Sequence, residues 1–141
     1  MPQSVVKLYV HLVWTTYCRE PLLSGKREQV VHRILTSEAN KLHCTVLAVG
    51  GIEDHVHVLL ALPPQFDLPR LLHQMKGVSS HVVRQDSDGE GFGWQDGYAA
   101  LSVSPNHVAR VKAYIKGQRE HHGCGEVHPA WEAAISAQRV D

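Results

Sequence analysis

Two histidines separated by one residue, His55 and His57, are the residues of this chain best suited to chemistry. They lie in the apolar segment 55–62 (HVHVLLAL), whose length and composition are typical of a buried β-strand. Side chains alternate between the two faces of a strand, so these histidines should share one face about 7 Å apart. Such a pair could supply two ligands of a metal ion, with Asp54 orienting one ring as a hydrogen-bond acceptor. The alternative is a pair of polar residues where the strand meets solvent.

A third ligand and a nucleophile are available near the end of the chain. A helix is predicted from Ser104 to about His122, because Ser104 can cap it and Pro105 suits its first position. Tyr114 and Gln118 are four residues apart and should therefore share a face of this helix. Tyr114 could be a nucleophile or an aromatic residue of the core, and Gln118 could be a metal ligand or a solvated polar residue.

Alternating strands and helices must position these groups. Strands are predicted at 4–15, 44–50, 55–62 and 98–104, and helices at 25–42, 67–85 and from Ser104 to about His122. This order predicts an α+β fold, a ferredoxin-like β-α-β-β-α-β sandwich with an antiparallel sheet, followed by a C-terminal helix that carries the tyrosine. In that topology the first and third strands are central neighbours. His11 of the first strand could then approach the histidine pair, although a structural role is favoured for it.

Local signals support the first two helices. The helix over 67–85 has Asp67 as a plausible N-cap and Pro69 in its first turn. The helix over 25–42 is expected to bury one face and to carry its charges on the other. The residues expected near the buried face are Val30, Val31, Ile34, Leu35 and Leu42.

Composition restricts the setting of this chemistry. The 141 residues fit one domain, 1–141. The chain has 14 basic and 14 acidic residues, so its net charge is zero, and its 11 histidines are the unusual feature of its composition. Any affinity for nucleic acid must therefore come from a local patch or a metal ion. No apolar run is long enough to cross a bilayer, and we expect a cytoplasmic protein with no membrane partner. Cys18, Cys44 and Cys124 are too far apart to indicate a disulfide framework.

Taken together, the motifs resemble the HUH single-tyrosine transposases of the smallest bacterial insertion sequences, the two-hundred/six-hundred-five group, and their repeat-associated relatives. The resemblance spans nearly the whole chain. Its motifs are VHLVWTT (10–16), DHVHVLL (54–60), KGxSS (76–80), WxxGY (94–98) and YIKGQ (114–118). An HxH motif alone is weak, but HxH and YxxxQ at this distance and in this order of elements form a specific signal.

The resemblance implies a transposase that cleaves and rejoins single-stranded DNA at the ends of a mobile element. It assigns His55, His57 and Gln118 to a divalent cation, Mg²⁺ or Mn²⁺, and Tyr114 to the attack that leaves a 5′-phosphotyrosine and a free 3′-hydroxyl. A cation is chemically reasonable, because a phenol with a pKa near 10 is a poor nucleophile at pH 7 and a phosphodiester is already negative. The resemblance also implies homodimers that bind DNA hairpins at the element ends, one per subunit, and that often complete each active site with the tyrosine helix of the other subunit. The sequence leaves open whether Tyr114 meets His55 of its own chain.

Several side chains could contact DNA. Arg110, Lys112 and Lys116 on the last helix and Lys76 on the second helix could neutralise phosphates, or form ordinary solvated faces. Three aromatic residues around the loop 86–97 could stack on unpaired bases or fill the core. These are Phe92, Trp94 and Tyr98.

The same residues also permit other interpretations. The residues His121, His122, Cys124 and His128 could form a zinc cluster, although their spacing fits no standard pattern, and His122 could replace Gln118 as a ligand. A domesticated, repeat-associated nickase would carry the same motifs. A non-catalytic single-stranded nucleic-acid-binding module is the third possibility, because RNA-recognition domains share this order of elements. Those domains place aromatic residues on the central strands, where this chain has histidines and aliphatic residues.

Overall fold

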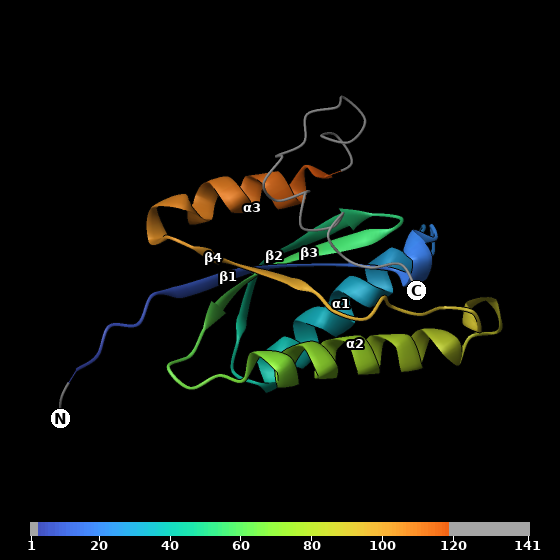
Figure 1. The fold of residues 1–141 in the computed structure, drawn as a ribbon, viewed down its shortest axis with the longest axis horizontal. Coiled ribbons are helices and arrows are strands. Elements are labelled where there is room, and N and C mark those ends of the chain that lie inside the picture. The colour runs from blue at the N-terminus through green and yellow to red at the C-terminus, as the bar shows by residue number, and fades with distance from the viewer. Residues whose placement is uncertain (1–2, 119–141) are drawn as a thin grey trace.

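The structure is a computed structural model, and it describes residues 3–118 of the chain. A four-stranded antiparallel sheet has helices on both of its faces (Figure 1). The strands are β1 (Leu8–Thr15), β2 (Thr45–Ile52), β3 (His55–Leu62) and β4 (Ala99–Val103), and the helices are α1 (Lys26–Lys41), α2 (Leu68–Arg84) and α3 (Val108–Lys116). Three short 3₁₀ turns are η1 (Tyr17–Arg19), η2 (Ser87–Gly89) and η3 (Pro105–His107). The predicted ferredoxin-like order of elements is therefore confirmed.

The strand order is β2-β3-β1-β4, so β1 and β3 are the central neighbours that the topology predicts. Their antiparallel register pairs Thr15 with His55 and Val13 with His57. On the other side of β3, Gly50 of β2 pairs with His57. The first residues of β3 and the last residues of β1 therefore meet at one end of the sheet.

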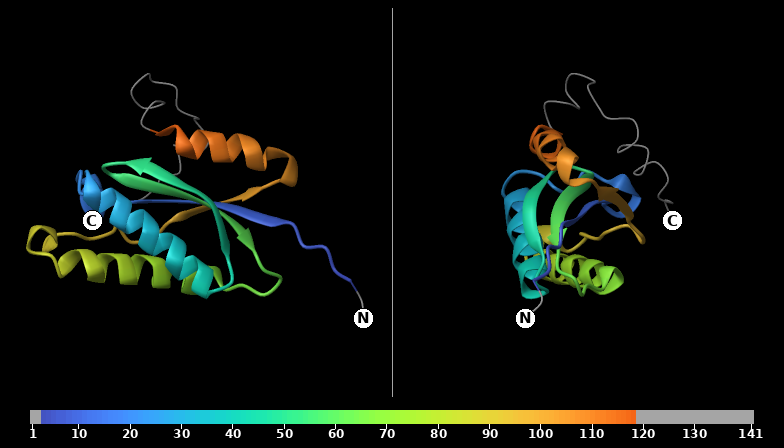
Figure 2. Two further views of the ribbon diagram at one scale, coloured as in Figure 1. Left: turned by 180° about the vertical axis from the view of Figure 1, so that it is seen from behind. Right: turned by 90° about the vertical axis from the view of Figure 1, so that its left-hand side faces the viewer.

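Helices α1 and α2 cover one face of the sheet, and α3 covers the other (Figures 1 and 2). Two apolar clusters follow from these layers, because alternate residues of each strand point to opposite faces. The larger cluster, between the sheet and α1 and α2, includes Leu12, Trp14, Leu35, Val58, Leu60 and Met75. The smaller one, under α3, consists of Ala48, Leu59, Val111 and Ile115, and it lies next to the buried histidines.

The close packing of α3 depends on a glycine in β2. A side chain at Gly50 would overlap the carbonyl oxygen of Ile115 and would lie 3.1 Å from its carbonyl carbon. Only a residue without a Cβ atom lets the helix backbone approach the strand this closely. Gly50 therefore sets the distance between α3 and the strand pair that carries His57.

A buried carboxylate connects the two helices on the other face. Glu38 of α1 is 3% exposed, and its oxygens lie 2.8 Å from Lys41 Nζ and 2.7 Å from Gln74 Nε2 of α2. The sequence pattern placed this charge on the solvated face and Val30 on the buried one, yet Val30 is 40% exposed. The prediction was wrong there because α2 offers a hydrogen-bond donor that periodicity cannot indicate.

Of the two predicted N-caps, Asp67 and Ser104, one is present in the structure. The Asp67 carboxylate accepts a hydrogen bond from the backbone N–H of Arg70 at 3.1 Å, so this N-cap is confirmed. Ser104 caps no backbone group, and its hydroxyl lies 3.1 Å from Nδ1 of His107. The predicted start of the last helix at Ser104 was therefore wrong, because η3 comes first and α3 begins at Val108. α3 ends at Lys116 before a turn at Gly117, Gln118 is again helical, and the predicted continuation to about His122 lies outside the described residues.

Three smaller predictions can also be compared with the structure. The first strand begins at Leu8 rather than at residue 4. Cys18 is half-buried, Cys44 is a buried free thiol, and Cys124 lies outside the described residues. Within residues 3–118, no helix is long and apolar enough to cross a membrane.

Candidate active site

His55 and His57 do share one face of β3, as strand alternation predicts. Both side chains are fully buried, and their ring centroids are 5.0 Å apart. The interpretation as polar residues at a solvent-exposed strand end is therefore wrong. Two imidazoles buried side by side beneath α3 need polar partners, because an unsatisfied buried ring nitrogen is costly.

The partner of His55 on one side is a carboxylate. His55 Nδ1 lies 2.7 Å from Oδ1 of Asp54, whose other oxygen lies 3.2 Å from Nη2 of Arg19 in η1. Partial burial raises the pKa of Asp54, but the hydrogen bond from His55 and the Arg19 guanidinium outweigh it and hold this pKa below its ordinary value. An ionised carboxylate only accepts hydrogen bonds, so it keeps a proton on His55 Nδ1. Nε2 of the same ring lies 3.2 Å from Oε1 of Gln118.

The partner of His57 is a second imidazole. Its Nδ1 lies 2.8 Å from Nε2 of His11, a fully buried residue of β1. The prediction that His11 could approach the pair is confirmed. On another side, the ring of Tyr114 stands edge-on to His57 with centroids 5.9 Å apart.

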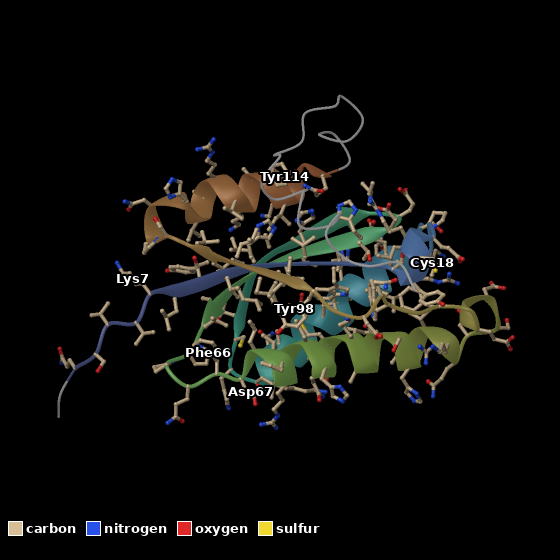
Figure 3. All side chains as sticks on the ribbon, in the orientation of Figure 1. Lys7, Cys18, Phe66, Asp67, Tyr98 and Tyr114 are labelled. Carbon is tan, nitrogen blue, oxygen red and sulfur yellow. The ribbon has the colours of Figure 1, made fainter. Side chains whose placement is uncertain are left out.

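Tyr114 and Gln118 come from the end of α3, which Figure 3 places across the sheet from α1 and α2. Their exposed fractions are 8% and 1%. Although the helix ends at Lys116, the Gln118 side chain turns back and donates a hydrogen bond to the carbonyl of Tyr114 at 3.3 Å. The two residues therefore lie together as predicted, on either side of the turn at Gly117.

The donor atoms suit a divalent cation. Neighbouring ligands in an octahedral Mg²⁺ or Mn²⁺ shell, each about 2.1 Å from the ion, are about 3 Å apart. The 3.2 Å between His55 Nε2 and Gln118 Oε1 is close to that spacing. Within the described part of the chain, no group of three or more His, Cys, Asp or Glu residues could hold a metal ion. A centre here would therefore use the two imidazoles and an amide oxygen, a set that also accepts softer ions such as Zn²⁺.

Two further metal hypotheses cannot be placed in this arrangement. The suggested zinc cluster, His121, His122, Cys124 and His128, lies outside the described residues, as does the use of His122 in place of Gln118.

The basic residues proposed for DNA lie on opposite faces of the sheet. Arg110 and Lys116 are exposed on α3 and Lys112 is half-buried there, close to Tyr114 in sequence. Lys76 of α2 is half-buried, and its ammonium donates hydrogen bonds to the carbonyls of Gln95 at 2.8 Å and Gly97 at 2.9 Å. Burial lowers the pKa of Lys76, and the charge of Asp96 opposes this effect. No sequence pattern indicated that this lysine holds the loop before β4.

The aromatic residues of that loop mainly fill the core. Phe92 is buried, and its ring packs edge-on against Trp94 with centroids 5.0 Å apart. The indole N–H of Trp94 donates to the Ser79 hydroxyl at 2.9 Å, and Tyr98 packs partly buried against the same cluster. Core filling therefore describes Phe92 and Trp94 better than stacking on bases.

Comparison with known proteins agrees with this geometry. The fold and the histidine pair facing a tyrosine helix fit the single-tyrosine class of DNA transposases. The family model described as "Transposase IS200 like" matches residues 4–118, and the chain belongs to this family.

Curated relatives and solved structures align over most of the chain. The transposase TnpA of ISDra2 from Deinococcus radiodurans is 29% identical over 82% of this chain and 87% of its own length. The transposase of IS200 from Salmonella typhimurium is 27% identical over 82% and 80%. A crystal structure of a candidate transposase from Deinococcus radiodurans has a TM-score of 0.65 and 28% identity, covering 84% of this chain and 98% of that one. A tyrosine transposase bound to a REP hairpin has the same TM-score with 14% identity, covering 90% and 74%, and so shows the shared fold.

Proposed function

We propose that this transposase cleaves and rejoins single-stranded DNA through a covalent bond to Tyr114, with a divalent cation held by His55, His57 and Gln118. The observation that supports this most is the convergence of these groups in one buried site. The Tyr114 ring is 5.9 Å from that of His57, and Gln118 Oε1 is 3.2 Å from His55 Nε2. These residues come from β3 and from the far end of the chain, and packing alone does not require two imidazoles and an amide beside a tyrosine.

The covalent step is a balanced exchange of esters. The Tyr114 oxygen bonds to phosphorus, the bond from phosphorus to the 3′ oxygen breaks, and the departing oxygen takes up a proton in place of the one that the phenol loses. A bound Mg²⁺ or Mn²⁺ would polarise the phosphate and offset its negative charge. Because one phosphodiester replaces another, a different 3′-hydroxyl can reverse the step and join new ends.

This chain's own residues would prepare the site. Asp54 and Arg19 orient His55, and His11 lies against His57. The helix end at Gly117 turns Gln118 toward His55, while Gly50 lets α3 lie close enough for Tyr114 to reach the same pocket. Tyr114 and His57 are neighbours within a single chain, which supports a site that one subunit can complete.

Cations on both sides of this site would guide the DNA strand. Arg110, Lys112 and Lys116 lie on the tyrosine helix. On the other side, β1 connects the site to Lys76. Thr15 of β1 pairs with His55, and its carbonyl accepts a hydrogen bond from the Gln95 N–H at 3.0 Å. The carbonyl of Gln95 in turn accepts a hydrogen bond from the Lys76 ammonium. A cavity of about 380 Å³ lies beside Lys76, between α2 and the loop before β4.

The natural substrate would be a DNA hairpin at each end of a mobile element, bound by a homodimer. One relative of the same fold is bound to a REP hairpin, which supports this class of substrate. The near-neutral charge of the chain agrees with recognition of shape more than of bulk negative charge. A domesticated repeat-associated nickase would use the same chemistry, and the DNA beside the gene distinguishes the two, since an active element carries hairpin-forming ends.

A non-catalytic binding module is less consistent with the structure. RNA-recognition domains bind bases on an open sheet face through aromatic residues. Here α3 covers the corresponding face, and the central strand β3 presents buried histidines beneath it.

The direct test replaces Tyr114 by phenylalanine. The protein is incubated with single-stranded DNA containing an element end and Mn²⁺, and the covalent adduct is measured on a denaturing gel. Tyr114→Phe should form no adduct, whereas Tyr17→Phe, the same change at a tyrosine that is 50% exposed, should match the wild type. An adduct with Tyr114→Phe at the wild-type level would show that another residue is the nucleophile.

A further inference from the structure

The hydrogen bond between His11 and His57 depends on which of the two rings carries the proton between them. Both rings are fully buried, His11 Nε2 and His57 Nδ1 are 2.8 Å apart, and the ring planes are tilted by 31°. A hydrogen bond between two neutral imidazoles needs one N–H and one bare nitrogen. The pair therefore has two arrangements of equal net charge, with the shared proton on His57 Nδ1 or on His11 Nε2.

Only one arrangement suits a metal ligand. A neutral imidazole carries a single N–H, so a proton on Nδ1 of His57 leaves a lone pair on its Nε2. If His11 donates instead, His57 must carry its proton on Nε2, and that nitrogen cannot bind a cation. The direction of one hydrogen bond therefore decides whether His57 can be a ligand.

The neighbouring histidine faces no such choice. The partner of His55 Nδ1 is the Asp54 carboxylate, which can only accept. A proton held on Nδ1 by this contact leaves the lone pair of the neutral ring on Nε2, the nitrogen that faces Gln118. His55 and His57 therefore have different kinds of hydrogen-bond partner. Asp54, beside His55, can only accept, whereas His11, beside His57, can accept or donate.

We propose that His11 is a positioning residue that accepts the Nδ1–H of His57 and so fixes the tautomer whose Nε2 can bind the divalent cation. This inference rests on the proposed function, because it assumes that His57 is a ligand. His11 touches neither the DNA nor the reacting atoms in this role. It acts through His57 alone, as groups behind metal-binding histidines commonly do.

The first measurement needs no metal and no variant. Long-range ¹H–¹⁵N spectra of the metal-free wild-type protein report which ring nitrogen of each histidine carries the proton. We expect His57 to be protonated on Nδ1 and His11 to have a bare Nε2. A proton on Nε2 of His57 would overturn the proposal, whatever the protein does with DNA.

The second measurement compares Mn²⁺ binding, followed by electron paramagnetic resonance without DNA. His11→Leu keeps an apolar volume but offers no acceptor, and we expect its affinity to fall by about 10- to 100-fold. His11→Gln offers an amide oxygen and should recover part of the loss. His73→Leu, at an exposed histidine of α2, should bind as the wild type does.

The outcomes separate this proposal from the proposed function. Wild-type affinity in a folded His11→Leu variant would show that His11 does not position His57. If the wild type itself bound no Mn²⁺, the proposed cation would be wrong, while the tautomer spectra would still decide how His11 and His57 share their proton. Those spectra also decide the matter if His11→Leu does not fold.

Discussion

Adding one methyl group at Gly50 tests whether the distance between α3 and the sheet controls the chemistry. Gly50 pairs with His57 across β2 and β3, and the backbone of Ile115, next to Tyr114, lies directly over it. The substitution Gly50→Ala inserts a Cβ atom at this contact without changing any polar group. It therefore changes the position of α3, and Tyr114 with it, without altering the chemistry of any proposed catalytic side chain.

The size of the effect follows from the contacts. The new Cβ atom would lie 3.1 Å from the carbonyl carbon of Ile115 and 3.2 Å from its Cγ2 atom, and the carbonyl oxygen would be closer still. Restoring ordinary contact requires α3 to move away by roughly 1 Å. Such overpacking costs about 1–3 kcal/mol of stability, and a misplacement of this size can slow a reaction by about 100-fold.

The assay is single-turnover formation of the covalent adduct on single-stranded DNA, combined with urea unfolding. Gly77→Ala is the matched control, because a Cβ atom at this glycine of α2 meets nothing within 4 Å and alanine favours a helix by about 0.5–1 kcal/mol. We expect Gly50→Ala to be slower and less stable, and Gly77→Ala to be as active as the wild type and at least as stable. A folded Gly50→Ala protein with the wild-type rate would refute the idea that this contact positions Tyr114.

Two further predictions concern charge. The hydrogen bonds from Lys41 and Gln74 hold the pKa of Glu38 below its ordinary value of 4.5. The ionised Glu38 therefore stabilises the fold fully above pH 4.5, and this contribution is lost as the pH falls through the lowered pKa. Glu38→Gln should therefore reduce the free energy of unfolding at pH 7 by about 1–3 kcal/mol. The free energy of unfolding of this variant should also decline less steeply toward pH 3 than that of the wild type. The control Glu90→Gln, at an exposed glutamate, should change neither the free energy of unfolding at pH 7 nor its dependence on pH. If Lys76 contacts a phosphate, Lys76→Gln should lower the slope of log affinity for single-stranded DNA against log salt by about 0.7. Lys7→Gln, which removes the same charge at the opposite end of β1 (Figure 3), should leave the slope unchanged, and equal slopes for the two variants would exclude the contact.

The strand pattern predicts much of the site. Alternation along HVHVLLAL places His55 and His57 on one face, and the order of elements places β1 beside β3, which brings His11 within reach. These inferences succeed because strand geometry and sheet topology leave few alternatives.

The supporting contacts could not be predicted in the same way. Arg19 reaches Asp54 from a 3₁₀ turn, Lys76 turns inward to two loop carbonyls, and α3 ends at Lys116. Each of these depends on where a loop or a helix end finds a hydrogen-bond partner in three dimensions. Glu38 shows the same limit, because helical periodicity marks a charge as exposed when a neighbouring helix satisfies it.

The position of α3 along the chain has a consequence for when the enzyme becomes active. His55 and Gln118 are separated by 63 residues, and α3 is the last helix of the described fold. Until a growing chain has been made through Gln118 and α3 has docked, the histidines lie on an uncovered sheet with no tyrosine beside them. Contacts between distant parts of a chain form late in folding. The capacity to cut DNA would therefore arise only once nearly all of this fold is complete, so partly made chains would hold the histidine pair without the means to break a strand.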